Sequence, residues 1–66
     1  MQVMINGESR VFKQPVTVSK LLDESGLAEK RVAVEINETI VPKSQHAQRM
    51  LADGDQVEII QAIGGG

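Results

Sequence analysis

The 66-residue chain has no cysteine, tryptophan or tyrosine, and Phe12 is its only aromatic residue. Without thiolates it can form neither a disulfide nor a thiolate metal site, and with His46 as the only imidazole it offers no zinc cluster. A chain this short buries roughly 60% of its unfolded surface, which is enough for one core but leaves no room for an enclosed active site. We therefore expect one small domain that is stabilised by packing alone, holds no metal and is not by itself an enzyme. His46 is expected to be a surface or half-buried side chain rather than a proton-transfer group.

Positive charge is also scarce. Seven basic residues against nine acidic ones give a net charge of −2, with no basic stripe to neutralise phosphates and no row of aromatic rings to stack on bases. The apolar stretch of residues 1–5 is too short for a signal peptide or a membrane span. The expectation is a soluble, cytoplasmic protein that uses neither nucleic acid nor membrane as a partner.

The beginning of the chain has the pattern of a β-hairpin. Val3 and Ile5 recur with the period of a strand that has one buried face. Asn6-Gly7 is a strong hairpin signal because both residues tolerate positive φ. A second strand is expected to return over residues 10–12, and Pro15 closes it.

A short helix is predicted next. Thr17 is a candidate N-cap, although Lys20 stands where a capping box would have Glu or Gln. Gly26 is a candidate left-handed C-cap, and Leu27 is expected to fold back on the helix. The spacing i, i+3, i+4 places three apolar residues on the buried face: Val18, Leu21 and Leu22.

The most regular strand pattern is that of residues 32–36, whose larger apolar side chains should point into the core. Asn37-Glu38 turns the chain, and a short strand at Ile40-Val41 is stopped by Pro42. The core-facing residues of the longer strand are expected to be Val32, Val34 and Ile36.

The remaining third is less regular. Residues 43–52 are predicted to be irregular or to form a single turn, with Ala47 and Leu51 facing inward. Asp53-Gly54-Asp55 is interpreted as a tight turn, because it lacks the further oxygen ligands of a calcium loop. A last strand over residues 56–61 leads to the end of the chain.

The order β-β-α-β-β-β is that of the β-grasp arrangement, an α+β fold in which one main helix covers one face of a mixed sheet. One helix leaves the other face largely uncovered. Exposed aliphatic residues on that face are either ordinary scattered side chains or a contiguous docking surface. Alternation places these residues on it: Met4, Val11, Ala33 and Ile60.

The chain ends in three glycines after Ile63. Such an end could be a frayed terminus or a linker. It could also be a working group, because a terminal glycine offers a carboxylate with no side chain beside it, on a segment thin enough to enter another protein's active site. We therefore divide the chain into a β-grasp domain over residues 1–62 and a flexible tail over residues 63–66.

These features together resemble the ThiS family of sulfur carriers of thiamine biosynthesis, whose members have a ubiquitin-like β-grasp fold. The resemblance covers essentially the whole chain, but no single stretch is specific. Asp-Gly-Asp and a glycine end also occur in the small subunit of molybdopterin synthase. The third terminal glycine is a mild departure, since at least two are expected, and it leaves the carrier role intact. The stretches that carry the resemblance are Ile5-Asn6-Gly7-Glu8, Val16-Thr17-Val18 with Leu21-Leu22, Val32-Ala33-Val34-Glu35-Ile36-Asn37, Ile40-Val41-Pro42-Lys43, Asp53-Gly54-Asp55-Gln56-Val57-Glu58 and the terminal glycines.

The resemblance implies a carrier rather than a catalyst. A ThiF-type enzyme would use ATP to adenylate the carboxylate of Gly66, and a sulfur-relay protein such as a cysteine desulfurase would supply the sulfur of the thiocarboxylate. Thiazole synthase would then take that sulfur into the thiazole phosphate ring. Ile63, Gly64 and Gly65 would lie in the partner's active site, and the carrier itself would bind no cofactor.

Two other interpretations stay open at this point. The small subunit of molybdopterin synthase also ends in a thiocarboxylated glycine but delivers its sulfur to a pterin precursor. A noncatalytic ubiquitin-like interaction module would explain the fold, although it would leave the glycine end without a purpose.

Overall fold

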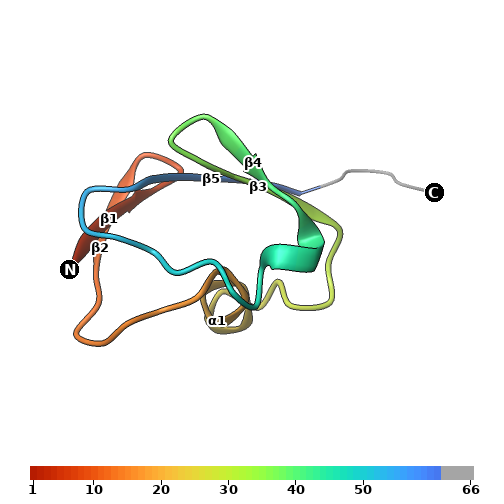
Figure 1. Ribbon diagram of the computed structural model, residues 1–66, viewed down its shortest axis with the longest axis horizontal. Coiled ribbons are helices and arrows are strands. Elements are labelled where there is room, and N and C mark those ends of the chain that lie inside the picture. The colour runs from red at the N-terminus through yellow and green to blue at the C-terminus, as the bar shows by residue number, and fades with distance from the viewer. Residues whose placement is uncertain (62–66) are drawn as a thin grey trace.

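The computed structural model describes residues 1–61, and its elements follow the predicted order (Figure 1). The paired strands are short, and one α-helix and one 3-10 turn occur among them. The elements are β1 (Gln2–Ile5), β2 (Glu8–Val11), α1 (Val18–Glu24), β3 (Val32–Ile36), β4 (Thr39–Val41), η1 (Lys43–Gln45) and β5 (Gln56–Gln61).

Two hairpins have the same two-residue turn. Asn6 and Gly7 join β1 to β2 with φ values of 50° and 83°, and Asn37 and Glu38 join β3 to β4 with φ values of 52° and 69°. Positive φ at both central positions matches the right-handed twist of the flanking strands, which is why such turns favour Asn and Gly. Both turns were predicted from the sequence and are confirmed.

The helix begins and ends as its capping residues predict. The Thr17 hydroxyl accepts a hydrogen bond from the Lys20 backbone N–H at 3.1 Å, which satisfies one of the free donors of the first turn. At the other end Gly26 has φ of 74°, its N–H donates to the Asp23 carbonyl and the Leu27 N–H donates to the Leu22 carbonyl at 2.8 Å. These two bonds form a Schellman motif, so the predicted glycine cap is confirmed.

The five strands form one mixed sheet in the order β2-β1-β5-β3-β4. β5 is the central strand, parallel to β1 and antiparallel to β3, and both hairpins are antiparallel. Figure 1 shows α1 and η1 on one side of this sheet. No helix of residues 1–61 lies on the other side, so the predicted open face is present.

The core lies between α1 and the covered face of the sheet. Val18 and Leu21 of the helix are completely buried, as are Val3 and Val34 of the sheet. Val32 and Ile59 are partly buried against this cluster, and for Val32 this confirms the predicted core-facing position. The other members of the core are Ile5, Phe12, Val16, Leu22, Ile36, Val41, Leu51 and Val57.

Two predictions for residues 43–52 were wrong. Ala47 is exposed, whereas His46 beside it is buried, with 7% of its surface accessible. The imidazole Nε2 lies 3.1 Å from the Val41 carbonyl, and the His46 carbonyl accepts a hydrogen bond from the Ser19 N–H. The side chain therefore ties η1 to the sheet and the backbone ties it to the helix, and this pairing leaves Ala47 facing solvent. Leu51 is buried, as predicted.

Candidate functional site

The site begins where β5 ends, because this strand leads into the terminal glycines. β3 pairs with β5 along its whole length, from Ile36 opposite Val57 to Val32 opposite Gln61. On the other side β1 reaches only to Ile5, opposite Val57. Strand pairing alone would therefore leave the last part of β5 held on one side.

The side chain of Asn6 extends this support. Its Oδ1 accepts a hydrogen bond from the Ile59 N–H at 2.8 Å, and its Nδ2 donates to the Ile59 carbonyl at 3.2 Å. The amide thus takes the place of the next residue of a parallel strand. Sequence reasoning identified Asn6 as a turn residue but missed this role. The sequence feature that could have suggested this role is the choice of asparagine at a turn position with positive φ, because its side chain, unlike that of glycine, carries a hydrogen-bond donor and an acceptor.

Asn37, the first residue of the other hairpin turn, binds the opposite end of β5. Its Oδ1 accepts from the Gln56 N–H at 3.0 Å, and its Nδ2 donates to Oδ1 of Asp55 at 3.0 Å. Asp55 is 6% exposed; its Oδ2 accepts from the Ala52 N–H and lies 3.9 Å from a guanidinium nitrogen of Arg49. The Asp53-Gly54-Asp55 segment is a turn, as predicted, with Gly54 at φ of 85°. Both turn asparagines therefore fix the strand that carries the tail.

The open face contains a cross-strand apolar pair close to the end of β5. Ala33 stands directly opposite Ile60, and Ile60 is 53% exposed. Met4 lies farther back, opposite Gln56, and borders the same hollow of about 550 Å³ as Ile60. Val11 does not join them, because it lies on the edge strand opposite Gln2. The structure therefore brings together Ala33 and Ile60, with Met4 nearby, and places Val11 at the other end of the face.

Two carboxylates separate these apolar positions. Glu35 stands directly opposite Glu58, and both side chains alternate onto the open face with Ala33 and Ile60. Their hollow is also bordered by Glu38 of the β3–β4 turn. Like charges directly opposite each other are mildly destabilising in a sheet. The open face thus combines a small apolar patch beside the strand end with an acidic centre.

Four predicted site residues, Ile63, Gly64, Gly65 and Gly66, lie outside the described residues. Within residues 1–61, no cluster of three His, Cys, Asp or Glu side chains has the arrangement of a metal site. The helix that the structure describes has seven residues, so none in this part of the chain is long and apolar enough to cross a bilayer.

The strand order, the single helix and the uncovered sheet face define a ubiquitin-like β-grasp domain. A crystal structure of the thiamine biosynthesis protein ThiS from Geobacter metallireducens is similar over the full length of both chains, with a TM-score of 0.83 and 28% sequence identity. The family model of the ThiS family matches residues 3–66. The chain therefore belongs to the ThiS family, as the sequence predicted.

Two kinds of relative match the whole chain. The sulfur carrier protein ThiS of Escherichia coli (strain K12) is 36% identical over 66 residues, which is the full length of both proteins. A thiazole synthase of Paramagnetospirillum magneticum is 52% identical over the same 66 residues, but there the chain spans only 20% of the relative's length. A region similar to this chain thus occurs alone in one relative and as part of a longer polypeptide in the other.

Proposed function

We propose that the chain is a sulfur carrier whose terminal glycine, Gly66, is converted to a thiocarboxylate for thiazole phosphate formation in thiamine biosynthesis. The observation that carries the proposal is the family match, which extends through the terminal glycines. The support of β5 by β3 and by the amide of Asn6 is consistent with it, because a reactive tail needs a fixed point of departure. The domain acts as a protein co-substrate, and the catalytic groups belong to its partners.

The chemistry requires activation by a partner. A terminal carboxylate has a pKa of about 3.3–3.7 in model peptides, so it is ionised at neutral pH and is a poor electrophile. A ThiF-type enzyme would join the carboxylate of Gly66 to AMP with release of pyrophosphate from ATP. AMP is a good leaving group from this acyl adenylate, so a sulfur nucleophile derived from a cysteine desulfurase would attack the Gly66 carbonyl carbon, form a carbon–sulfur bond there and release AMP. Because ATP is consumed, we place the reaction in the cytoplasm.

The tail and the domain have separate tasks in this scheme. Four extended residues, 63–66, reach about 13–14 Å beyond residues 1–62, which is enough to enter a partner's active site. A Cβ on Gly66 would crowd the carbonyl that ATP and sulfur must approach, and Gly64 and Gly65 let the backbone bend in a narrow channel. Ordering glycines costs conformational entropy, so the tail alone should bind weakly. Docking by the folded domain must therefore supply part of the affinity.

Two partners take the tail in this proposal. The ThiF-type enzyme activates it, and thiazole synthase receives the sulfur. The second assignment is supported by the thiazole synthase relative, in which a region similar to this chain is covalently part of that enzyme. No bound cofactor is needed on the carrier itself.

Changes confined to the tail test the proposal. Extending the chain by one residue after Gly66, or removing Gly65 and Gly66, should abolish ATP–pyrophosphate exchange by the adenylating enzyme. Circular dichroism should show the same folded domain, since the glycines have no apolar side chain to add to the core. After incubation of the wild-type chain with its partner enzymes, intact-mass analysis should show the mass increase that results from replacing one oxygen by sulfur at the terminus. Normal exchange by the extended chain would contradict the proposal.

A further inference from the structure

A cavity of about 430 Å³ opens between the end of α1, the α1–β3 connection and the end of β5. Its apolar wall is formed by Leu22, Ala28 and Val32. The buried imidazole of His46 also lines it and is held by the hydrogen bond of its Nε2 with Val41. Leu22 and His46 are buried and Val32 is partly buried against the core, whereas Ala28 is exposed, so the cavity has an apolar floor that rests on the packed core and an exposed apolar edge at Ala28.

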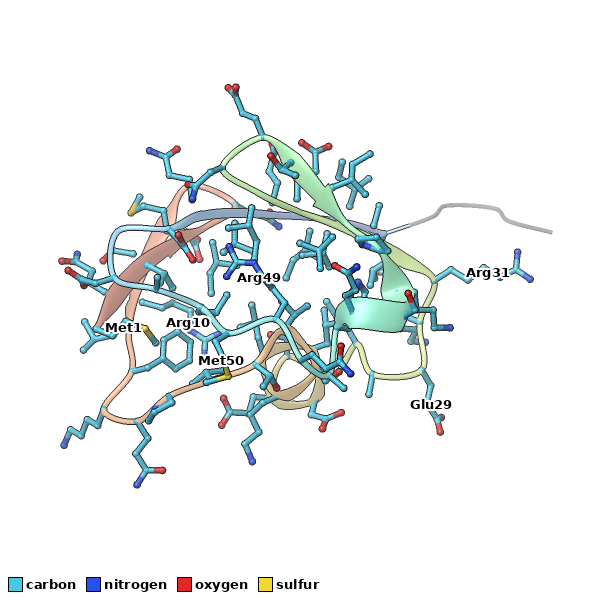
Figure 2. The ribbon with its side chains drawn as sticks, viewed as in Figure 1. Met1, Arg10, Glu29, Arg31, Arg49 and Met50 are labelled. Atoms are coloured by element: carbon cyan, nitrogen blue, oxygen red, sulfur yellow. The ribbon has the colours of Figure 1, made fainter. Side chains whose placement is uncertain are left out.

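Three of the chain's seven basic residues stand around this floor, Lys30, Arg31 and Lys43. All three are exposed, and no ion pair within residues 1–61 involves any of them. Within residues 1–61, no carboxylate lines the cavity; Asp23 borders only an adjoining hollow. Figure 2 shows Arg31 projecting outward just before the start of β3, while Glu29 on the same connection points in a different direction. A cationic rim has therefore formed in a protein of net negative charge.

The rim lies beside the departure point of the tail. Ile60 lines the cavity, and Val32 on its floor is paired with Gln61, the last residue of β5. An enzyme that takes up residues 63–66 must bring its surface close to this end of the sheet. The cavity therefore falls within reach of any partner that binds the tail.

We propose that this cavity binds an acidic segment of thiazole synthase, with carboxylates against Lys30, Arg31 and Lys43 and an apolar side chain on the floor. The proposal rests on the proposed function, because it assigns a docking surface to one of the two partners named there. Charge complementarity with three exposed cations favours an anionic occupant. The position beside the tail favours a protein segment over a free metabolite. Thiazole synthase is the partner with which a related domain shares one polypeptide.

The contact should control affinity through charge. Ion pairs at the edge of an interface contribute modestly and are screened by salt, with a Debye length of about 10 Å at 0.1 M ionic strength. Reversing two of the three cations replaces attraction by repulsion, so we expect binding to weaken about tenfold at low salt and less at high salt.

Calorimetric titration of the full-length chain with thiazole synthase, at low and high ionic strength, tests this surface. The double variant Arg31→Glu/Lys43→Glu should bind about tenfold more weakly at low salt. The matched control is Lys13→Glu/Lys20→Glu, which makes the same charge change at two exposed lysines around a different hollow and should bind like the unmodified chain. Ala28→Leu, which fills the cavity without changing charge, should also weaken binding. Thermal melts should show that every variant is folded, and Arg31→Gln replaces the double variant if that melts early.

Three outcomes would overturn the inference. If Arg31→Glu/Lys43→Glu binds thiazole synthase with unchanged affinity, the cavity is not part of the interface. If the control variant weakens binding equally, the effect comes from the change in net charge and not from the cavity. If Arg31→Glu/Lys43→Glu binds the adenylating enzyme more weakly but binds thiazole synthase normally, thiazole synthase is not the occupant of the cavity. The proposed function is measured separately by adenylation of the unmodified chain. A chain that is adenylated and binds thiazole synthase regardless of Arg31 and Lys43 would refute only this inference.

Discussion

Asn6 holds Ile59 by both polar atoms of its side-chain amide, one accepting from the Ile59 N–H and the other donating to its carbonyl. The bond pair lets a turn residue continue the pairing of β1 with β5 beyond the end of β1. The last strand is consequently supported on both sides to within two residues of its end. In a protein whose proposed reactive group lies five residues farther along, this support holds the strand that precedes the tail.

Replacing Asn6 by glycine tests the clamp, because glycine keeps the positive φ of the turn and removes only the amide. Two exposed hydrogen bonds are lost, each contributing about 0.5–1.5 kcal/mol, so the free energy of unfolding should fall by about 1–3 kcal/mol. Hydrogen exchange at the Ile59 amide should accelerate more than exchange at Val34, which lies in the β3 ladder. Equal protection of Ile59 in both proteins would contradict the role assigned to Asn6.

Thr17→Ala should remove the helix N-cap. The Lys20 N–H then loses its side-chain acceptor, and unfolding in urea should show a loss of about 1 kcal/mol. Thr17→Ser keeps a hydroxyl and serves as the control. If serine destabilises as much as alanine, the methyl group of Thr17 matters and the cap does not.

Truncation of Leu21 should be far more damaging than truncation of an exposed residue. Leu21 is fully buried between the helix and the sheet, so Leu21→Ala should cost about 2–5 kcal/mol in unfolding free energy. For so small a domain this is a large part of its stability. Ile40→Ala, at a position that is 67% exposed on an edge strand, should change the melting temperature little. Comparable losses for both would show that the core is misplaced.

The open face is predicted to dock on the adenylating enzyme through Ala33 and Ile60. A charge placed at the exposed Ile60 by Ile60→Lys should raise the KM for the carrier in ATP–pyrophosphate exchange about tenfold, with a small change in the melt. Val11→Lys is the matched control, because Val11 is also on the open face and 71% exposed but lies on the edge strand, away from Ala33 and Ile60. If Val11→Lys raises KM as much as Ile60→Lys, docking extends over the whole face. If neither does, the partner uses another surface.

The sulfur acceptor should be chosen by docking, because any carrier thiocarboxylate is chemically able to give up sulfur. The thiocarboxylated chain should support thiazole formation with its thiazole synthase. It should work poorly with the large subunit of molybdopterin synthase and a pterin precursor. Efficient molybdopterin formation without thiazole product would reverse the acceptor assignment and leave the sulfur-carrier role standing.

Local patterns in the sequence were sufficient for most of the secondary structure. The alternation of Val3 with Ile5 and the cap residues Thr17 and Gly26 depend on contacts within a few residues, so they can be recognised from the chain alone. The prediction failed at residues 43–52, where there is no period to follow. There Ala47 was assigned to the core in place of His46, whose burial depends on partners in β4 and α1.

Alternation also determined which face of the sheet a residue occupies, but not its position along that face. Met4, Val11, Ala33 and Ile60 were all correctly placed opposite the core positions. Only the register of β1, β3 and β5 decided that Ala33 meets Ile60 while Val11 lies elsewhere. Register is a tertiary property because it depends on pairing between residues far apart in the chain.

The sequence by itself determined the order of elements, the buried side of the helix and of the longer strands, and the glycine end that led to the proposed carrier role. These properties arise from short-range periodicity, turn chemistry and composition. Tertiary structure alone decided that the amides of Asn6 and Asn37 bind β5, and that Lys30, Arg31 and Lys43 meet around one apolar floor. The two asparagines come from segments far from β5, and Lys43 comes from a segment separate from Lys30 and Arg31. Only strand pairing in the first case, and the packing of the connections around the sheet end in the second, bring these groups within reach of each other.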